Sequence, residues 1–372
     1  MNDTIPDSIP ACPHALEPTY EGDFVLDGQL VLESGRTLVR PTLHYAVYGK
    51  LNAARDNAVL IFHALSGSAR VGDWWPEVFA PGALLSLDHD FVLCINLLGS
   101  CYGSTGPGSV DPETGLVYGP DFPLVSIRDN VRAQAQLLDS LGIRRLRLVL
   151  GGSIGGMQAL EWTIHDPGRI ERAAIIAVAP LSAMGLALNH LQRQAIQNDP
   201  DWDGGYYLPQ RVPRHGLSLA RQIGMLSYKS AELFDERFSR KPNRNGEDPW
   251  SLDDLGGGLI GGRFDIAGYL DYQGERFVDR FDANSYLAIL RSMDTWDPLN
   301  GHPDPQAAFG RIQARLTFLG ISSDWLFPSH SVREFAETIR AAGAHAEYRE
   351  MTSSHGHDAF LAEQAELIRL LQ

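Results

Sequence analysis

The feature that most constrains this chain is an apolar, strand-like run that leads straight into a glycine–serine turn. Residues 146–150 form the apolar run, residues 151–155 then read Gly-Gly-Ser-Ile-Gly, and a helix-like segment begins at Met157. Between a strand and a helix, the motif Gly-x-Ser-x-Gly predicts a nucleophile elbow. The turn needs small residues such as Gly151 and Gly155, and it lifts the hydroxyl of Ser153 above the sheet edge. The alternative is an ordinary tight turn with a solvated serine.

The other apolar runs indicate the fold around this turn. Runs without polar alternation are typical of strands buried on both faces of a parallel sheet, and they occur at 59–62, 91–95, 146–150 and 173–178. Helical spacing separates two of them, at 127–141. The same alternation returns near the end of the chain, with strand-like runs at 315–321 and 346–351 on either side of a helix-like segment at 332–342. The sequence therefore predicts an α/β, doubly wound fold.

The domain organisation follows from where this pattern stops. Residues 1–20 are expected to be loose, and residues 21–180 and 306–372 to form the α/β core. Between them, residues 181–305 are mostly helix-like, and we call this insertion the lid, because it would cover the carboxyl ends of the strands, where ligands bind. A hairpin is predicted near the start of the core, with strands at 24–26 and 30–32 around Asp27-Gly28.

Charge and composition exclude several classes of function. The net charge of −15 argues against nucleic acid as a partner, although a local arginine can still bind a small anion. The first 18 residues lack the basic and apolar regions of a signal peptide, and no apolar run reaches the roughly 18–20 residues that span a bilayer. We therefore expect a cytoplasmic protein that does not enter a membrane. Of the three cysteines, Cys94 lies in an apolar strand and Cys101 lies among turn residues.

A serine nucleophile needs a base and an acid that orients the base, and here the expected chain order is Ser, Asp or Glu, His. Asp324 follows the strand-like run 315–321, and His357 follows the run 346–351, so both would lie on the same side of the sheet as Ser153. These three residues are the predicted catalytic triad. Rivals for the acid are Asp294 and Asp297, which lie in the lid and do not follow a strand; the rival for the base is His355.

The oxyanion formed during acyl transfer needs two backbone N–H donors. The residue after the nucleophile, Ile154, supplies one, and the loop after the run 59–62 supplies the other, which we assign to Leu65. We interpret His63 in that loop as a core histidine. The pair His355 and His357 has no third ligand at useful spacing, so no metal is expected. The glycines between 256 and 262 lack the ending of a phosphate loop and predict a flexible turn of the lid.

Taken together, the motifs resemble the homoserine O-acetyltransferase family, the α/β-hydrolase-fold acyltransferases of methionine biosynthesis. The resemblance covers nearly the whole chain beyond about residue 20. It rests on the segments 57–60, 63–68, 96–107, 151–162, 199–207, 220–228 and 355–361. Two departures are small: many members have Met where this chain has Ile154, and Thr where it has Ser66. Because only the backbone of Ile154 is needed, the first change is expected to be tolerated.

The resemblance implies further site residues and partners. By position, Arg221 and Asp358 would hold the amino-acid substrate, and an arginine fork suits a carboxylate as an aspartate suits an ammonium. Tyr228 shares a helix face with Arg221 and Met225, and Asn57 opens the first matching segment; both are expected to bind substrate. A second face of that helix, formed by Leu219, Ile223, Leu226 and Leu233, is expected to pack on the lid core. The implied partners are acyl-CoA as co-substrate, L-homoserine, and a second copy of the chain in a homodimer, with no cofactor.

Several alternatives remain open at the level of sequence. The substrates could instead be succinyl-CoA or L-serine, because a methylene difference changes binding by only about 1–3 kcal/mol. The chain could also be a plain esterase of the same fold, or a binding module without activity. Arg221 could be a surface ion pair, and Cys101 could replace Ser153 as nucleophile, although its loop is not an elbow and is better interpreted as a wall of the site.

Overall fold

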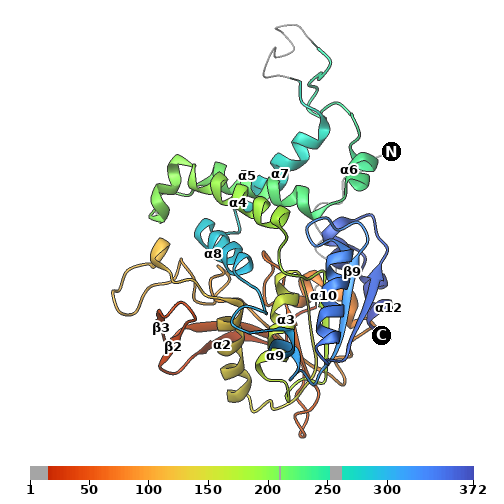
Figure 1. The fold of residues 1–372 in the computed structure, drawn as a ribbon. Helices are drawn as coiled ribbons and strands as arrows, with labels where there is room; N and C mark the ends of the chain where they lie inside the picture. The colour runs from red at the N-terminus through yellow and green to blue at the C-terminus, as the bar shows by residue number, and fades with distance from the viewer. Residues whose placement is uncertain (1–15, 209–210, 252–261) are drawn as a thin grey trace.

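The computed structural model describes residues 16–208, 211–251 and 262–372, and its centre is a large sheet (Figure 1). This eight-stranded sheet has the order β1-β4-β6-β5-β7-β8-β9-β10. From β6 onward all neighbours are parallel, whereas the two pairs at one edge, β1–β4 and β4–β6, are antiparallel. The strands are β1 (Tyr20–Val25), β4 (Thr42–Gly49), β5 (Ala58–Phe62), β6 (Phe91–Ile95), β7 (Leu146–Gly152), β8 (Arg172–Ile176), β9 (Arg315–Ile321) and β10 (Ala346–Met351). The predicted α/β, mostly parallel architecture is confirmed.

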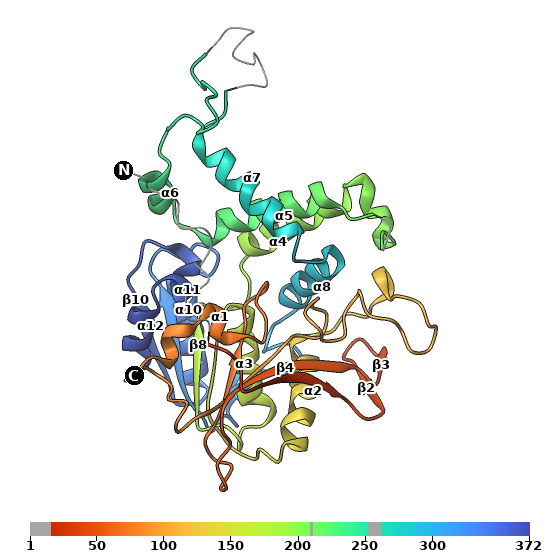
Figure 2. The same cartoon turned by 180° about the vertical axis from the view of Figure 1, so that it is seen from behind.

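Helices cover both faces of the sheet, which explains why its strands lack polar alternation. In β5, Leu60 and Phe62 belong to one hydrophobic cluster, whereas Val59 and Ile61 belong to the other. The first cluster is covered by helices visible at the front of Figure 1, namely α2 (Ile127–Ser140), α3 (Ile154–His165), α9 (Pro305–Phe309) and α10 (Ser329–Ala341). The second is covered by helices seen from behind in Figure 2, namely α1 (Val71–Trp74), α11 (Ala359–Ala362) and α12 (Gln364–Leu371).

The N-terminal region differs from the sequence prediction in two ways. The predicted hairpin is wrong, because β1 pairs with β4, while β2 (Gln29–Val31) pairs with β3 (Thr37–Val39). The segment expected to be loose lies mainly in residues 1–15, outside the described part, but its last residues are held. Glu17 pairs with Arg70 at 2.7 Å, and Thr19 donates to the carbonyl of Val47 at 3.0 Å.

Helices form the structure between β8 and β9 in the described residues of the lid. They are α4 (Ala183–Gln197), α5 (Arg214–Tyr228), α6 (Ala231–Arg237), α7 (Asp265–Val278) and α8 (Ala283–Asp294). Both views place them beyond the ends of the strands, above the body of the sheet (Figures 1 and 2). The predicted glycine-rich turn falls mostly on residues 252–261, outside the described residues. In the described residues, no helix is both long and apolar enough to cross a membrane.

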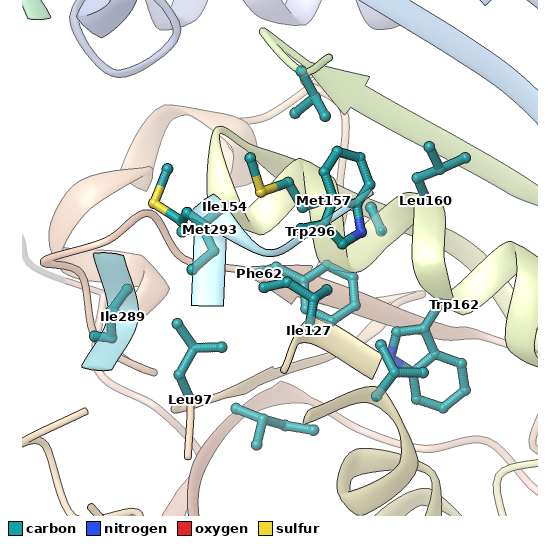
Figure 3. Close-up of a cluster of buried hydrophobic side chains, with 14 of the residues drawn as sticks. Phe62, Leu97, Ile127, Ile154, Met157, Leu160, Trp162, Ile289, Met293 and Trp296 are labelled. Carbon is teal, nitrogen blue, oxygen red and sulfur yellow. The ribbon is translucent and has the colours of Figure 1, made fainter. Parts of the chain in front are cut away.

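The lid shares its hydrophobic core with the α/β body. Ile289 and Met293 of α8 belong to the same buried cluster as Phe62 of β5 and Met157 of α3, as the close-up in Figure 3 shows. Residues of α4, α5 and α7 belong to this cluster as well. The lid is therefore anchored through α8 to the helix that follows the nucleophile.

One expectation about the lid is wrong. The face of α5 that was expected to pack on the lid core is open to solvent, since Leu219 is 50% exposed and Leu226 is 42% exposed. Ile223 is only partly buried, and Leu233, which is buried, belongs to α6. Helix α5 therefore buries its opposite side, through residues such as Leu217 and Ala220.

Candidate active site

Ser153 occupies a strained turn between β7 and α3. Its φ of 58° lies in the left-handed region, which is unfavourable for a residue with a side chain. The neighbouring glycines are required by close contacts: a Cβ on Gly151 would lie 2.5 Å from the carbonyl carbon of Gly155, and one on Gly155 would lie 2.4 Å from the carbonyl oxygen of Phe62. The backbone of Ser153 is held by a 3.0 Å bond from its N–H to the carbonyl of Ile176. This geometry is that of a nucleophile elbow.

The structure brings Asp324 and His357 together at the carboxyl ends of β9 and β10. Nδ1 of His357 lies 2.7 Å from Oδ2 of Asp324. The other carboxylate oxygen of Asp324 accepts two 2.9 Å bonds from the N–H groups of Leu326 and Phe327, which fix its orientation. Nε2 of His357 is buried and has no hydrogen-bond partner among the described residues, and the His357 side chain lines the same cavity as Ser153. The base is thus oriented, with its free nitrogen available to a proton donor.

The environment of His357 sets its proton affinity. Burial alone would lower the pKa of the imidazole, but the charge and hydrogen bond of Asp324 outweigh burial, so that the pKa is raised above its usual value. The ring is enclosed by aromatic side chains, with centroid distances of 5.3 Å to Phe327, 5.7 Å to Phe360 and 6.1 Å to Tyr228. A buried imidazole that favours its charged form is suited to accept a proton and stabilise the resulting cation.

The two predicted oxyanion donors lie where they were expected, one directly after the nucleophile and one on the loop after β5. Ile154 is the first residue of α3, so its N–H has no partner within the helix. Leu65 lines the cavity beside Ser153, on the loop that follows β5. Neither N–H donates to a backbone carbonyl in the described residues, which leaves both available to a developing oxyanion.

A cavity of about 1410 Å³ opens above these groups, between the strand ends and the lid. Arg221, Met225 and Tyr228 of α5 line it together, as their helical spacing predicts. The guanidinium of Arg221 lies 5.4 Å from the ring centre of Tyr228 and 4.8 Å from that of Phe277. In the described chain, Arg221 forms no ion pair with an aspartate or glutamate, so the alternative of a surface ion pair is wrong. A cation held by two aromatic rings is available to an anionic ligand.

Asp358 also lines the cavity, and it already has a cationic partner that sequence reasoning missed. Nζ of Lys229 lies 2.9 Å from Oδ2 of Asp358. Lys229 follows the last residue of α5, and nothing in the local pattern marks it, because the pairing joins the lid to the loop that carries His357. A second missed residue is Arg280, which donates to the carbonyl of Ser66 at 3.0 Å beside the oxyanion loop.

Asn57 is not part of this site, and its assignment to substrate binding is wrong. It lies just before β5, at the opposite end of that strand from the oxyanion loop, and it does not line the cavity. Its side-chain amide donates to the carbonyls of Lys50 at 2.9 Å and His89 at 2.8 Å. These bonds satisfy the amide locally, so Asn57 fastens the loop before β5.

The remaining candidates have structural explanations. His63 is fully buried, and burial lowers its pKa to about 4, in agreement with a neutral core histidine. His355 pairs with Glu363 through Nδ1 at 2.5 Å. Asp294 accepts from Asn189 at 2.7 Å, and Asp297 caps its own turn through Leu299, so neither rival acid reaches His357. No group of three or more His, Cys, Asp or Glu side chains in the described ranges is arranged to hold a metal ion.

The two cysteines in the described residues do not provide a second nucleophile. Cys94 is fully buried in β6. Burial raises the pKa of the Cys101 thiol to about 11, so the reactive thiolate is scarce at neutral pH. Cys101 itself does not line the cavity, but its loop forms a wall of the cavity, as expected, through Tyr102 and Gly103.

Comparison with known proteins agrees with this geometry. The family model of the alpha/beta hydrolase fold matches residues 57–364. Homoserine O-acetyltransferase of Geotalea uraniireducens is 43% identical over 92% of this chain and 93% of its own length. The enzyme of the same name from Symbiobacterium thermophilum is 47% identical over 91% and 89%. A homoserine O-succinyltransferase of Alkalilimnicola ehrlichii is 44% identical over 90% and 89%.

Solved structures are similar over the same extent. The homoserine O-acetyltransferase of Bacillus anthracis superposes with a TM-score of 0.85 at 25% identity, covering 94% of this chain and 95% of that one. The esterase E22 has a TM-score of 0.83 at 24% identity, covering 95% of this chain and all of that one (100%), which shows a shared fold. The elbow and the oriented histidine agree with what these relatives indicate. The chain belongs to the homoserine O-acetyltransferase family of the α/β-hydrolase fold.

Proposed function

We propose that this protein is an acyl-CoA-dependent O-acyltransferase that transfers acetyl from acetyl-CoA to the hydroxyl of L-homoserine. The observation that carries the proposal is the pairing of His357 with Asp324 in the same cavity as Ser153 and the unpaired cation Arg221. A nucleophile alone suits any hydrolase of this fold. The cation at hand for an amino-acid carboxylate, together with relatives named for homoserine acylation, favours a transferase.

The first half of the reaction loads the serine. His357 Nε2 takes the proton of Ser153 as Oγ bonds to the thioester carbon, and the N–H groups of Leu65 and Ile154 stabilise the negative oxygen. The carbon–sulfur bond then breaks. The proton on His357 goes to the departing CoA thiolate, which leaves an acyl-serine. Asp324 keeps the imidazole in the correct tautomer throughout, because its Oδ2 accepts from Nδ1.

The second half moves the acyl group to the amino acid. The homoserine hydroxyl gives its proton to His357 Nε2 and attacks the acyl carbon, and the bond to Ser153 Oγ breaks as that oxygen regains the proton. Arg221 binds the substrate carboxylate, Asp358 binds the ammonium, and Tyr228 forms the wall between Arg221 and His357. Both charged ends of the amino acid are thereby fixed, which places the hydroxyl ahead of water.

A kinetic matrix tests this proposal. Thiol release from acetyl-CoA and from succinyl-CoA is measured with homoserine, with serine and without an amino acid, for the wild type and for Ser153→Ala. We expect sustained release only with homoserine, a single burst without it, and no release in Ser153→Ala. Sustained release that does not depend on an amino acid would instead identify a hydrolase. Full activity in Ser153→Ala would refute the acyl-serine scheme.

The main alternative changes the acyl group and keeps the chemistry. A relative named homoserine O-succinyltransferase is as similar as those named acetyltransferases, at 44% identity. Overall similarity therefore does not choose between acetyl and succinyl donors. The same matrix separates them, since a succinyl enzyme would show a higher kcat/KM with succinyl-CoA than with acetyl-CoA.

We also propose that the protein is a homodimer that forms through the lid. The exposed face of α5 carries Leu219 and Leu226, and neighbouring α4 exposes Met184 and Leu191, which are 57% and 53% exposed. Four large apolar side chains exposed on two helices that pack against each other favour an interface at this face of the lid. A second copy that places the same face against it would bury all four side chains.

A further inference from the structure

The carboxylate expected to bind the substrate ammonium is already neutralised by the protein itself. Lys229 Nζ lies 2.9 Å from Asp358 Oδ2, and the two side chains are only 14% and 22% exposed. Both residues line the cavity that contains Ser153 and His357. An ammonium group therefore already occupies one oxygen of the carboxylate that an incoming amino group would need.

The backbone of Lys229 is fixed against the loop that carries the histidine. The indole N–H of Trp325 donates to the carbonyl of Lys229 at 3.1 Å. The hydroxyl of the next residue, Ser230, donates to the carbonyl of Ser354. A Cβ on Gly356 would lie 2.7 Å from the carbonyl carbon of Lys229, so the two segments are in direct contact. With its backbone held, Lys229 can leave Asp358 only by movement of its side chain, whose four-carbon stem is flexible.

The Lys229–Asp358 pair lies beside the catalytic base, where it balances charge. Asp358 follows His357 in the chain, and Asp324 contacts the same imidazole, so two carboxylates lie close to one ring. A partly buried carboxylate without a partner is unfavourable. Lys229 balances the charge of Asp358 while the amino-acid site is empty, and a substrate ammonium would balance it when the site is filled.

From these contacts we propose that Lys229 is an internal competitor of the substrate. Its ammonium occupies Asp358 in the empty and acylated enzyme, and the amino group of homoserine displaces it on binding. This inference rests on the proposed function, because it assumes that Asp358 receives the substrate ammonium. It makes Lys229 a residue that weakens amino-acid binding, and it selects for acceptors whose own cation can replace the lysine.

Steady-state kinetics of Lys229→Met test this role. In a ping-pong reaction, kcat/KM for homoserine reports only the capture of homoserine by the acyl-enzyme, and kcat/KM for acetyl-CoA reports only acylation. Removing the competitor should raise kcat/KM for homoserine about three- to tenfold, the range expected when a competing ion pair leaves the site free only part of the time. The value for acetyl-CoA should change little at a pH above the raised pKa of His357, where the imidazole is neutral with or without Lys229.

Two further variants serve as controls. Lys229→Arg keeps a cation beside Asp358 and should leave kcat/KM for homoserine within about twofold of the wild type. Lys241→Met removes a lysine from the lid that does not line the cavity and instead donates to the carbonyl of Arg237 at 2.9 Å. It should change neither constant. An unchanged or lower kcat/KM for homoserine in Lys229→Met would overturn the proposal, because Lys229 would then help or ignore the substrate.

A crystal structure with bound substrate tests the proposal even if Lys229→Met does not fold. In a crystal structure of Ser153→Ala soaked with homoserine, we expect the substrate ammonium at Asp358 and Lys229 Nζ moved away. A lysine that still contacts Asp358 while the substrate amino group lies elsewhere would refute competition. The acylation burst distinguishes failure of the proposed function from failure of the competition. If the wild type forms no acyl-Ser153, the proposed function is wrong. If the burst is normal and Lys229→Met leaves the homoserine kinetics unchanged, only the competition by Lys229 is wrong.

Discussion

At the scale of single residues, the elbow shows how close contacts dictate sequence. Gly155 is needed because of Phe62 and His63, whose carbonyl oxygens would lie 2.4 and 3.0 Å from an added Cβ. These atoms belong to the backbone and cannot rotate away as a side chain could. The same backbone leads into the oxyanion loop, so a displacement there would also disturb the N–H of Leu65.

We therefore expect Gly155→Ala to cost about 1–3 kcal/mol of stability and to reduce the acylation burst as well. Thermal unfolding and CoA release measure the two effects. Gly168→Ala is the matched control, since an added Cβ there meets no atom within 4 Å and the φ of Gly168 is not positive. Equal behaviour of the two variants would show that the contacts at Gly155 do not constrain the elbow.

The contact between Asp324 and His357 leads to a second prediction, which concerns how activity depends on pH. His357 acts as a base only when neutral, and Asp324 raises its pKa, so activity should fall as the pH drops through that raised value. In Asp324→Asn the charge is lost while burial continues to lower the pKa. The acidic limb of kcat/KM for acetyl-CoA should therefore move to lower pH, while the maximal value falls by about 10⁴-fold. If the acidic limb of kcat/KM stays at the same pH in Asp324→Asn, Asp324 does not set the pKa of His357.

At the scale of elements, one buried ion pair connects the body to the end of the lid. Glu161 of α3 accepts from Arg128 of α2 at 3.0 Å and from the indole of Trp296 at 3.2 Å. Burial raises the pKa of Glu161, and Arg128 opposes that rise. Arg128 also donates to the carbonyls of Asp297 and Asn300, which follow α8. The segment that returns from the lid is thus held to two core helices by a single guanidinium.

Arg128→Met should leave the Glu161 carboxylate buried without its cation and cost about 3 kcal/mol at neutral pH. The pH dependence of this loss of stability follows from the Glu161 carboxylate, whose pKa in the folded protein rises further in the variant. The loss of stability is small below the pKa of the unfolded state, where the carboxyl is protonated. It grows as the pH rises through the pKa of the folded state. Thermal unfolding at pH 5 and pH 8 measures this. Arg145→Met, which breaks the exposed pair with Glu171, is the control and should cost no more than about 1 kcal/mol.

The lid also shows what element-level prediction missed. The spacing of Leu219, Ile223 and Leu226 correctly predicts an apolar helix face, but not which surface that face contacts. In the structure, Leu219 and Leu226 are exposed, whereas the cavity face with Arg221 and Met225 lies where its spacing indicates. Periodicity identifies a face, and only the arrangement of neighbouring helices assigns it to core, cavity or solvent.

At the scale of the whole molecule, the exposed faces of α4 and α5 predict an assembly. Replacing Leu219 and Leu226 with glutamate would place charges in the proposed lid interface, so we expect the double variant to be monomeric by light scattering at concentrations where the wild type is dimeric. Leu116→Glu changes an equally apolar residue that is 70% exposed outside these helices, and it should leave the mass unchanged. A wild-type protein that is monomeric throughout would rule out the dimer.

The sequence by itself determined the features that depend on local pattern and chain order. Buried strands identified the α/β sheet, the glycines identified the elbow, and Asp324 and His357 were found because each follows a strand whose end must meet the others at one edge. The hairpin prediction failed because a turn signal does not specify a strand's partner, and β1 pairs instead with β4.

Only the tertiary structure decided the contacts between segments distant in the chain. It removed Asn57 from the site by pairing its amide with two backbone carbonyls, and it placed Lys229 of the lid against Asp358 beside the catalytic histidine. No sequence spacing encodes such pairs, because the distance between them depends on how the lid packs on the sheet. The chemistry of Ser153 was therefore evident from the sequence, whereas the groups that control access of the amino acid to it were not.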